Sequence, residues 1–391
     1  MEKTDRRYDA AVIGAGPAGA VFASQLARMC PDLKILVIDG QTEDRPKVCG
    51  GLLAPDAQKV LASLGLTLPN SVLADPQIFA VDTIDLTSGI RRLYQRHYLN
   101  MDRYAFDRWL VSMIPAQVEI IRARCEAMSV CEDGYMLTVG GMRYHAKAIV
   151  GADGANSIVR KTFIGHVPYQ YTAVQEWYRH PSGDLPHYSC IFDPVTSDSC
   201  SWTICKDGYV IFGGSFAKYG CRAAFAEQKQ RLETMLGCQF GASVKREACL
   251  VSSPRHWSDI ICGIPGVYLI GEAGGFISAS SFEGISSAML CGQYLAEAFA
   301  NGTSKEDILR RYQHLTRALR LKLWIKTVKR AVLCSPILRY CIMKSGIQSM
   351  TRSDVYEHQN NQKNTVCSCR SHSDRSVDIH LCDSLEHARS L

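Results

Sequence analysis

The sequence predicts a mixed α/β fold, from two observations near its N-terminus. An apolar segment, residues 8–13, runs directly into the turn Gly14-Ala15-Gly16-Pro17-Ala18-Gly19, and a second apolar segment, Lys34–Ile38, ends at Asp39. A strand, a Gly-x-Gly-x-x-Gly turn, a helix, a second strand and an acid about 20 residues later form the fingerprint of a Rossmann-like dinucleotide-binding unit. We assign all six turn residues and Asp39 to a cofactor site.

Each glycine of the turn has its own reason to lack a side chain. Gly14 permits the tight turn, Gly16 lets backbone N–H groups approach a pyrophosphate, and Gly19 lets the following helix pack closely on the strand. The helix that begins near Pro17 directs its partly positive N-terminus at the phosphates. We expect Asp39 to accept hydrogen bonds from a ribose. The turn alone does not distinguish NAD from FAD.

The positive charge of the chain is concentrated near its C-terminus. The 391 residues carry a net charge of +6, with 47% apolar and 21% charged residues, as in ordinary globular proteins. Twelve Lys or Arg and only Glu306 and Asp307 lie between Lys305 and Arg352, a net charge of +10, so the rest carries −4. Such a block can face anionic lipid, nucleic acid, an acidic partner or only solvent. We predict no nucleic-acid partner, and keep two interpretations of 305–344: peripheral contact with the inner face of a membrane, or a solvated surface.

The cysteines indicate a reducing compartment. They number 17 and lack the close pairing of a zinc ribbon or a disulfide scaffold. The charged N-terminus leaves no room for an apolar signal segment, and no apolar stretch is long enough to span a membrane. We expect a cytoplasmic protein. The Cys and His residues between Cys367 and His387 match no regular zinc pattern, so we predict no metal site.

We expect the chain to pass repeatedly between two units. The nucleotide-binding unit is predicted from residues 1–74, 101–162 and 263–303, and the substrate unit from the strands in 75–100 and the β-rich, aromatic-rich segment 163–262. Basic helices are predicted over 304–350. The tail, 351–391, has few large apolar residues and is expected to be disordered.

Several further segments carry a resemblance to a known family. They are Lys47-Val48-Cys49-Gly50-Gly51-Leu52-Leu53-Ala54-Pro55-Asp56-Ala57, Arg103-x-x-Phe106-Asp107, Gly151-Ala152-Asp153-Gly154-Ala155-Asn156-Ser157, Gly271-Glu272-Ala273-Gly274-Gly275-Phe276-Ile277-Ser278 and Phe282-Glu283-Gly284-Ile285. From Tyr8 to about Ile347 the chain resembles the p-hydroxybenzoate-hydroxylase-type flavoproteins, their geranylgeranyl-reductase-like branch and, within it, the bacterial CbrA family.

The resemblance implies a Rossmann-like FAD-binding domain, an interleaved antiparallel β-sheet substrate domain and C-terminal helices. It implies FAD as the cofactor, and adds these residues to the opening turn and Asp39 as its contacts: Gly50, Gly51, Arg103, Asp153, Gly154, Gly271, Glu272, Gly284 and Ile285. The family usually has Asp where this chain has Glu272, which is one methylene longer. We therefore expect Glu272 to contact the cofactor at a shifted position or through a water molecule.

Cys49 has two interpretations. In the geranylgeranyl reductases the equivalent Cys-Gly-Gly loop lies beside the isoalloxazine, and the cysteine is a candidate for delivering or relaying a proton while flavin N5 delivers hydride. A thiol reacts as the thiolate, which the nearby cation Lys47 or the flavin site would favour. Alternatively, Cys49 is a small apolar spacer beneath the ring.

The substrate end of the site is where the chain departs from the family. Reductases of this branch line the substrate cavity with a Tyr-x-Trp-x-Phe-Pro-Lys run, and the corresponding run here, Cys200–Lys206, keeps only Trp202 and Lys206. We assign Trp202 to the cavity, with a core role as the alternative. We assign Lys206 to catalysis, with a turn role as the alternative. The same run partly resembles the Trp-x-Trp-x-Ile of flavin-dependent halogenases.

The resemblance implies an FAD-dependent oxidoreductase that reduces C=C bonds of an isoprenoid or other hydrophobic substrate by hydride transfer from reduced flavin N5. No second Gly-x-Gly-x-x-Gly turn follows a strand, so the reductant is expected to be NAD(P)H that binds transiently or a protein electron carrier. The alternatives are a flavin-dependent monooxygenase or halogenase, and a non-catalytic flavin- or lipid-binding protein.

Overall fold

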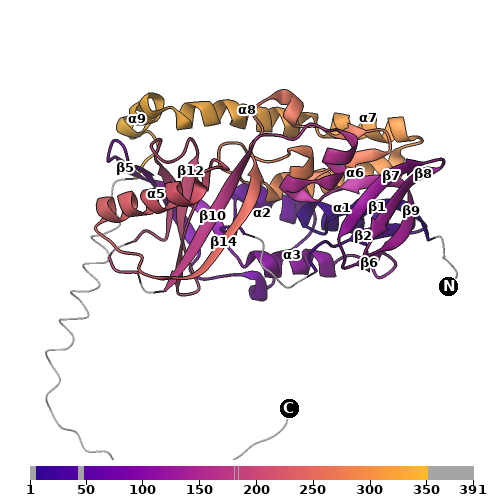
Figure 1. Ribbon diagram of the computed structural model, residues 1–391, viewed down its shortest axis with the longest axis horizontal. Coiled ribbons are helices and arrows are strands. Elements are labelled where there is room, and N and C mark those ends of the chain that lie inside the picture. The colour runs from indigo at the N-terminus through magenta and orange to yellow at the C-terminus, as the bar shows by residue number, and fades with distance from the viewer. Residues whose placement is uncertain (1–5, 43–47, 180, 184, 351–391) are drawn as a thin grey trace, which may run out of the picture. The chain divides into compact units, whose positions relative to one another are not determined.

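Two β-sheets with helices around them make up the described part of the chain (Figure 1). The computed structural model describes residues 6–42, 48–179, 181–183 and 185–350. Lys47, the tail over 351–391 and its Cys and His residues lie outside these ranges. The mixture of helices with one mainly parallel and one mainly antiparallel sheet confirms the predicted α/β fold class.

The first sheet is mainly parallel. Its strands in spatial order are β15 (Gly263–Ile264), β16 (Val267–Leu269), β9 (Met142–Gly151), β1 (Arg7–Ile13), β2 (Ile35–Ile38) and β6 (Glu119–Ile121). The strands from β16 to β6 run parallel, and β15 is antiparallel to β16. The hairpin of β7 (Cys125–Cys131) and β8 (Gly134–Val139) joins the sheet through β9. Every residue of β2 is buried, as in a sheet that is covered on both faces.

Helices cover the first sheet. One apolar core joins α1 (Pro17–Met29) to α6 (Ile285–Asn301), and includes Phe22, Leu26 and Leu295. The helix α3 (Arg103–Ser112) adds Phe106 and Leu110 to this core. A second core includes Leu137, Ile149 and Val159, the last from the short helix α4 (Ile158–Phe163).

The second sheet is mainly antiparallel. Its strands in spatial order are β14 (Ser243–Ser252), β10 (Gln170–Arg179), β13 (Tyr209–Phe216), β12 (Cys200–Lys206), β11 (Tyr188–Phe192), β4 (Ile78–Asp85), β5 (Arg91–Asn100) and β3 (Leu52–Leu53). Only the pair of β4 and β11 is parallel among these strands. The helix α5 (Cys221–Leu236) packs on this sheet through Phe225 and Leu232.

The chain alternates between the two sheets. After β1 and β2 it enters the second sheet with β3, β4 and β5, and α2 (Pro55–Ser63) follows β3. It returns for β6 to β9, leaves again for β10 to β14, and ends in the first sheet with β15 and β16. The strand β3 belongs to the second sheet although it lies in the segment 1–74 that we assigned to the nucleotide-binding unit.

Three basic helices follow α6: α7 (Lys305–Leu315), α8 (Arg317–Cys334) and α9 (Pro336–Ser345). We predicted basic helices over 304–350, and within this segment α7 is separated from α8 at Thr316. Thr316 is buried, and its Oγ1 donates to Tyr312 O at 2.7 Å. Among the described helices, none combines the length and the apolar character that a membrane span needs.

The turn between β1 and α1 leaves no space for a side chain at Gly19. An added Cβ there would lie 2.0 Å from the carbonyl oxygen of Gly14. We expect Gly19→Ala to lower the free energy of unfolding by about 1–3 kcal/mol, because β1 and α1 must separate. Urea unfolding followed by circular dichroism measures this. The matched control is Gly40→Ala, where an added Cβ meets nothing within 4 Å and no change is expected. Equal stability of the two variants would contradict the close contact.

Candidate functional site

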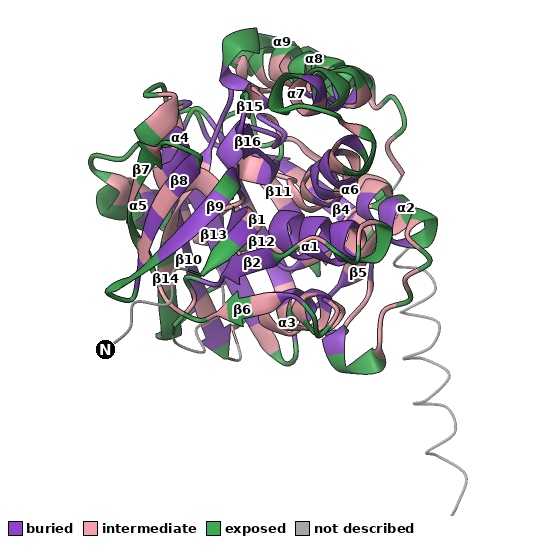
Figure 2. Ribbon diagram, turned by 90° about the vertical axis from the view of Figure 1, so that its right-hand side faces the viewer, coloured by how far each residue is buried: buried purple, intermediate pink, exposed green. Residues whose placement is uncertain are grey.

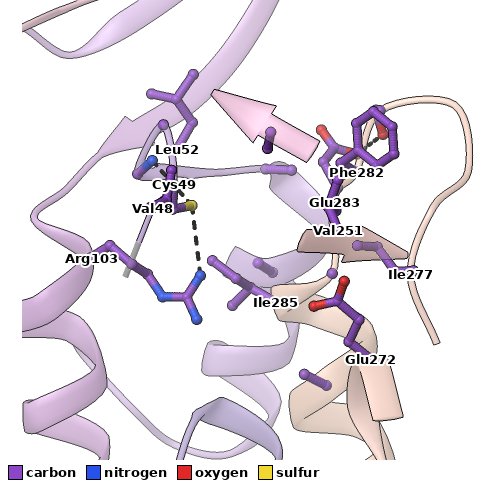
Figure 3. Close-up of a pocket in the computed structure, with 18 of the residues that line it drawn as sticks. Val48, Cys49, Leu52, Arg103, Val251, Glu272, Ile277, Phe282, Glu283 and Ile285 are labelled. Atoms are coloured by element: carbon purple, nitrogen blue, oxygen red, sulfur yellow. Dashed lines mark hydrogen bonds between the residues drawn. The ribbon is translucent and has the colours of Figure 1, made fainter. Parts of the chain in front are cut away.

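One pocket brings together most of the residues that the sequence singled out. It has a volume of about 260 Å³ and lies between the N-terminal turns of α1 and α6, the loop before α2, and strands of the second sheet (Figure 3). The predicted site residues that line it are Gly16, Pro17, Ala18, Cys49, Gly50, Gly51, Arg103, Gly154, Trp202, Glu272, Gly284 and Ile285. The predicted site residues that do not line it are Gly14, Ala15, Gly19, Asp39, Asp153, Lys206 and Gly271.

The glycine turn presents a helix N-terminus to this pocket. Gly14 has φ +107°, which favours glycine. Gly16 is the N-cap residue of α1 and supplies no side-chain acceptor, Pro17 is in the first turn, and the first turn contains no acidic residue. An added Cβ at Gly16 would meet nothing within 4 Å, so this position opens into the pocket. Backbone N–H groups at such a terminus are suited to an anion.

Asp39 and Asp153 flank the turn outside the pocket lining. Asp39 is buried at the end of β2, and accepts from Arg108 Nη1 at 2.8 Å and from Gln41 N at 3.1 Å. The sequence did not predict Arg108 as its partner. Asp153 Oδ2 accepts from Ile158 N at 2.7 Å, while its buried Oδ1 has no hydrogen-bond partner in the described residues. Burial raises the pKa of Asp153 above its ordinary value.

The segment from Gly271 to Ile285 supplies a second helix N-terminus. Gly284 is the N-cap of α6 and provides no side-chain acceptor, and Ile285 begins the helix. Glu272 lines the pocket, and its Oε1 accepts from Ser252 N at 2.8 Å, a contact that holds the end of β14. Gly271 has φ +58° and lies behind this wall.

The Cys49 loop is held by a buried arginine. In Figure 3 the Arg103 guanidinium points at the Cys49 sulfur, and the Nη1 to Sγ distance is 3.6 Å. Gly51 N also donates to this sulfur, at 3.4 Å, and Arg103 Nε donates to Asp107 Oδ1 at 2.9 Å. Burial opposes the charge of Arg103, but Asp107 and Cys49 outweigh it and raise the pKa of the guanidinium. We expected Lys47 to be the cation near Cys49; Lys47 lies outside the described residues, and Arg103 occupies this role in the structure.

Lys206 acts on the backbone of the same loop. Its buried Nζ donates to the carbonyl oxygens of Met101 at 2.5 Å, Gly50 at 2.9 Å and Gly51 at 3.4 Å. Burial lowers the pKa of Lys206. An added Cβ at Gly51 would lie 2.2 Å from this Nζ, so the glycine lets the ammonium approach. Lys206 does not line the pocket. Its position therefore favours a structural role, in which it holds the loop, and not the catalytic role that we predicted.

Trp202 forms part of the pocket wall. It pairs with Gly213 on β13, where an added Cβ would lie 2.6 Å from the indole Nε1, so the glycine makes room for the ring. The indole Nε1 is buried and has no hydrogen-bond partner in the described part of the chain. Trp202 lines this pocket, and its role toward a substrate stays a prediction.

The pocket lining also contains a polar pair that was not predicted from the sequence. Tyr98 OH donates to Glu283 Oε1 at 3.0 Å, and both residues line the pocket. Burial raises the pKa of Tyr98, and Glu283 raises it further, so the phenol stays protonated. Glu283 is part of a segment that carried the resemblance, but nothing in the sequence identifies Tyr98, near the end of a strand, as its partner.

No cluster of metal-ligating side chains is present in the described residues. Groups of three or more His, Cys, Asp or Glu that could bind an ion are absent there. The Cys and His residues of the tail lie outside those residues, so the prediction for them is untested.

Comparison with known proteins finds close relatives over most of the chain. The chain is 43% identical over 352 residues to Protein CbrA of Escherichia coli O157:H7, covering 87% of this chain and 97% of the relative. Protein CbrA of Shigella dysenteriae serotype 1 matches with the same identity and coverage. No family model matches the chain.

Solved structures of similar fold are flavoproteins and a reductase-like protein. The geranylgeranyl bacteriochlorophyll reductase-like protein of Thermoplasma acidophilum has a TM-score of 0.73 at 17% identity, covering 84% of this chain and 88% of its own. The flavin-dependent brominase Bmp2 has a TM-score of 0.63 at 18% identity, covering 92% and 100%. A variant of Klebsiella pneumoniae HpxO complexed with FAD has a TM-score of 0.64 at 15% identity, covering 92% and 99%. At these identities the likeness concerns the fold.

The position of Lys206 yields a test of its role. In Lys206→Met three carbonyl oxygens lose their donor, and we expect the free energy of unfolding to fall by about 1–3 kcal/mol in urea titrations. Lys218→Met is the control, because Lys218 is exposed and its loss should leave the unfolding midpoint unchanged. Equal midpoints for the two variants would contradict a structural role for Lys206.

Proposed function

The chain belongs to the CbrA family, and we propose that it is an FAD-dependent oxidoreductase that reduces carbon–carbon double bonds of an isoprenoid or other hydrophobic substrate. One observation carries the proposal: the glycine turn of the Rossmann-like unit and the wall of the second sheet face the same pocket. A cofactor at the turn and a substrate at the wall would share one cavity. Active sites of this kind are concave, mostly apolar and contain a few convergent polar groups.

The residues at the turn fit the phosphates of FAD. The N-terminus of α1 has neither a side-chain cap nor an acidic residue in its first turn, and the Cβ position of Gly16 opens into the pocket. We assign Gly16, Pro17 and Ala18 to the phosphates. We assign Asp39 to the ribose, because it directly follows β2, where a Rossmann-like unit has its ribose-binding acid.

The flavin end of the cofactor fits the second set of residues. The uncapped N-terminus of α6 at Gly284 and Ile285 and the loop at Gly50 and Gly51 line the pocket together. We assign these residues and Glu272 to the flavin and its chain, as the resemblance implies. A bound flavin supplies the redox chemistry, and the electron donor is proposed to be NAD(P)H or a protein carrier.

The chain's own side chains contribute positioning, proton handling and exclusion of water. Cys49 Sγ, which accepts from Arg103 and from Gly51 N, is the group that we propose to hold or move a proton. Lys206 is proposed as a positioning residue, because it holds the loop that contains Cys49. Trp202 is proposed to contact the substrate from the wall of the second sheet.

A hydrophobic substrate suits the lining of this pocket. Apolar side chains come from the second sheet and from the segment before α6; they include Ile204, Leu250, Val251, Ile277 and Phe282. Such a lining favours apolar ligands with few polar groups. The mass of lipid that copurifies with the yellow protein is the most direct test. Reduction of an isoprenoid should add 2 Da for each double bond that is lost, and a colourless protein with no flavin after denaturation would contradict the proposal.

The second candidate is a flavin-dependent monooxygenase or halogenase. The fold that the chain shares with the brominase Bmp2 favours it. Oxygen consumption that depends on substrate, without a saturated product, would select this candidate over a reductase. Anaerobic oxidation of the reduced protein by an isoprenoid would select the reductase.

The open space at Gly16 gives a test of cofactor binding. We expect Gly16→Val to fold, because an added Cβ meets no atom of the chain within 4 Å, but to lose its flavin, because the side chain fills the phosphate site. Flavin absorbance per protein measures occupancy, and circular dichroism measures folding. Gly40→Val, which is also unobstructed at its Cβ, should keep the flavin. A fully yellow Gly16→Val protein would contradict the assignment.

Replacement of the thiol tests proton handling. Cys49→Ser should keep FAD bound, and its turnover with an isoprenoid that copurifies should fall about 100-fold, the usual size of a lost acid or base. Cys221→Ser is the control, because Cys221 lies in α5 outside the pocket lining. Equal turnover in the two variants would assign Cys49 the spacer role.

A further inference from the structure

The helices α8 and α9 expose an unusual number of large apolar side chains. We call their outer face the α8–α9 surface, and it comprises Leu321, Trp324, Ile325, Val328, Ile337, Leu338, Tyr340 and Ile342. Figure 2 shows both helices at one edge of the fold, with much of their ribbon coloured as exposed. Contiguous exposed apolar patches usually mark an interaction site.

The spacing in α8 separates this surface from the core. Leu319 and Leu323 are buried on the side that packs on the protein. Leu321, Trp324, Ile325 and Val328 repeat at the i, i+3, i+4 and i+7 spacing of one helix face, and all are exposed. A surface helix needs only one apolar stripe to pack on its own core. The second stripe of α8 is exposed and is not needed for packing on the core.

Cations surround the second stripe. No Asp or Glu occurs in residues 308–350, which contain ten Lys or Arg. Some of these cations pair with acids of the fold, as Lys326 does with Glu283 at 3.7 Å and Arg330 with Asp198 at 2.8 Å. Arg317, Lys329 and Lys344 are exposed.

An anionic lipid bilayer suits this combination better than a second copy of the chain. Interfacial helices place Trp and aliphatic side chains at the headgroup boundary and cations beside anionic headgroups. A two-fold contact between copies would set the same cations against each other. We propose that the α8–α9 surface docks the protein on an anionic membrane.

The inner side of α8 reaches the pocket wall. Lys326 lies 3.7 Å from Glu283, and Glu283 and its neighbour Phe282 line the pocket. Docking would thus bring the wall that surrounds a hydrophobic substrate close to the lipid. This consequence for substrate access rests on the proposed function, whereas the docking itself does not.

Vesicle binding by the purified full chain tests the proposal. We expect cosedimentation with phosphatidylcholine vesicles that contain 30% phosphatidylglycerol, about tenfold weaker binding to phosphatidylcholine alone, and weaker binding in 0.5 M NaCl, which screens the charges. The emission of Trp324 should shift to the blue on binding, and this shift should be absent in Trp324→Phe. Absence of cosedimentation, or a dimer in analytical ultracentrifugation that covers the surface, would overturn the proposal.

Matched substitutions locate the contact. Ile325→Glu, at a side chain 55% exposed, should lower the vesicle partition coefficient about tenfold or more by loss of apolar burial and added negative charge. Val244→Glu, at a side chain 57% exposed in β14, makes the same change in charge outside the α8–α9 surface and should bind as the unaltered protein does. Equal loss in both variants would overturn the proposed surface. Flavin content, measured in parallel, tests the proposed function separately, because docking does not require FAD.

Discussion

The contact of backbone with backbone at the first turn is the constraint on which the site depends. An added Cβ at Gly14 would lie 2.4 Å from Ala152 O, and one at Gly19 would lie 2.0 Å from Gly14 O, so β1, β9 and α1 meet without side chains between them. Gly292 extends this close packing to α6, since a Cβ there would lie 2.5 Å from Ala18 O. Two helix N-termini thereby reach one pocket, where they can favour negative charge at two separate places along a bound cofactor.

The sequence predicts those features whose cause is local. A glycine turn after an apolar strand is recognisable because its chemistry is contained in a few consecutive residues. The Lys206 contacts could not be predicted in this way, because its partners, Gly50, Gly51 and Met101, are more than 100 residues away in the chain. Arg103 and Cys49 are 54 residues apart and Tyr98 and Glu283 are 185 apart, so these contacts are also set by the fold and not by local sequence. The strand β7 could not be predicted from periodicity, because its exposure does not alternate and its sequence lacks the usual period of two.

Buried charges join segments that are distant in the chain. Arg160 donates to the carbonyl oxygens of His166 at 2.7 Å, Ala273 at 3.0 Å and Asp259 at 3.0 Å. Burial lowers the pKa of Arg160 to about 10, at which it remains a cation near neutral pH. Arg339 in α9 donates to Asp85 at the end of β4 at 2.9 Å, and both side chains are 2% exposed. Such pairs fix position more than they add stability, because desolvation offsets their attraction. The contact between Arg339 and Asp85 holds α9 against the second sheet.

The repeated passage of the chain between two sheets has a consequence for synthesis. In the first sheet, the strand β9 has no partner on one side until β16, which ends at Leu269, has been synthesised. The second sheet is incomplete until β14, which ends at Ser252, has been synthesised. A ribosome-bound chain that ends before these residues therefore has unpaired strand edges in both sheets. Unpaired strand edges promote aggregation. The pocket lining extends to Ala288, so the pocket can form only after about three-quarters of the chain has emerged.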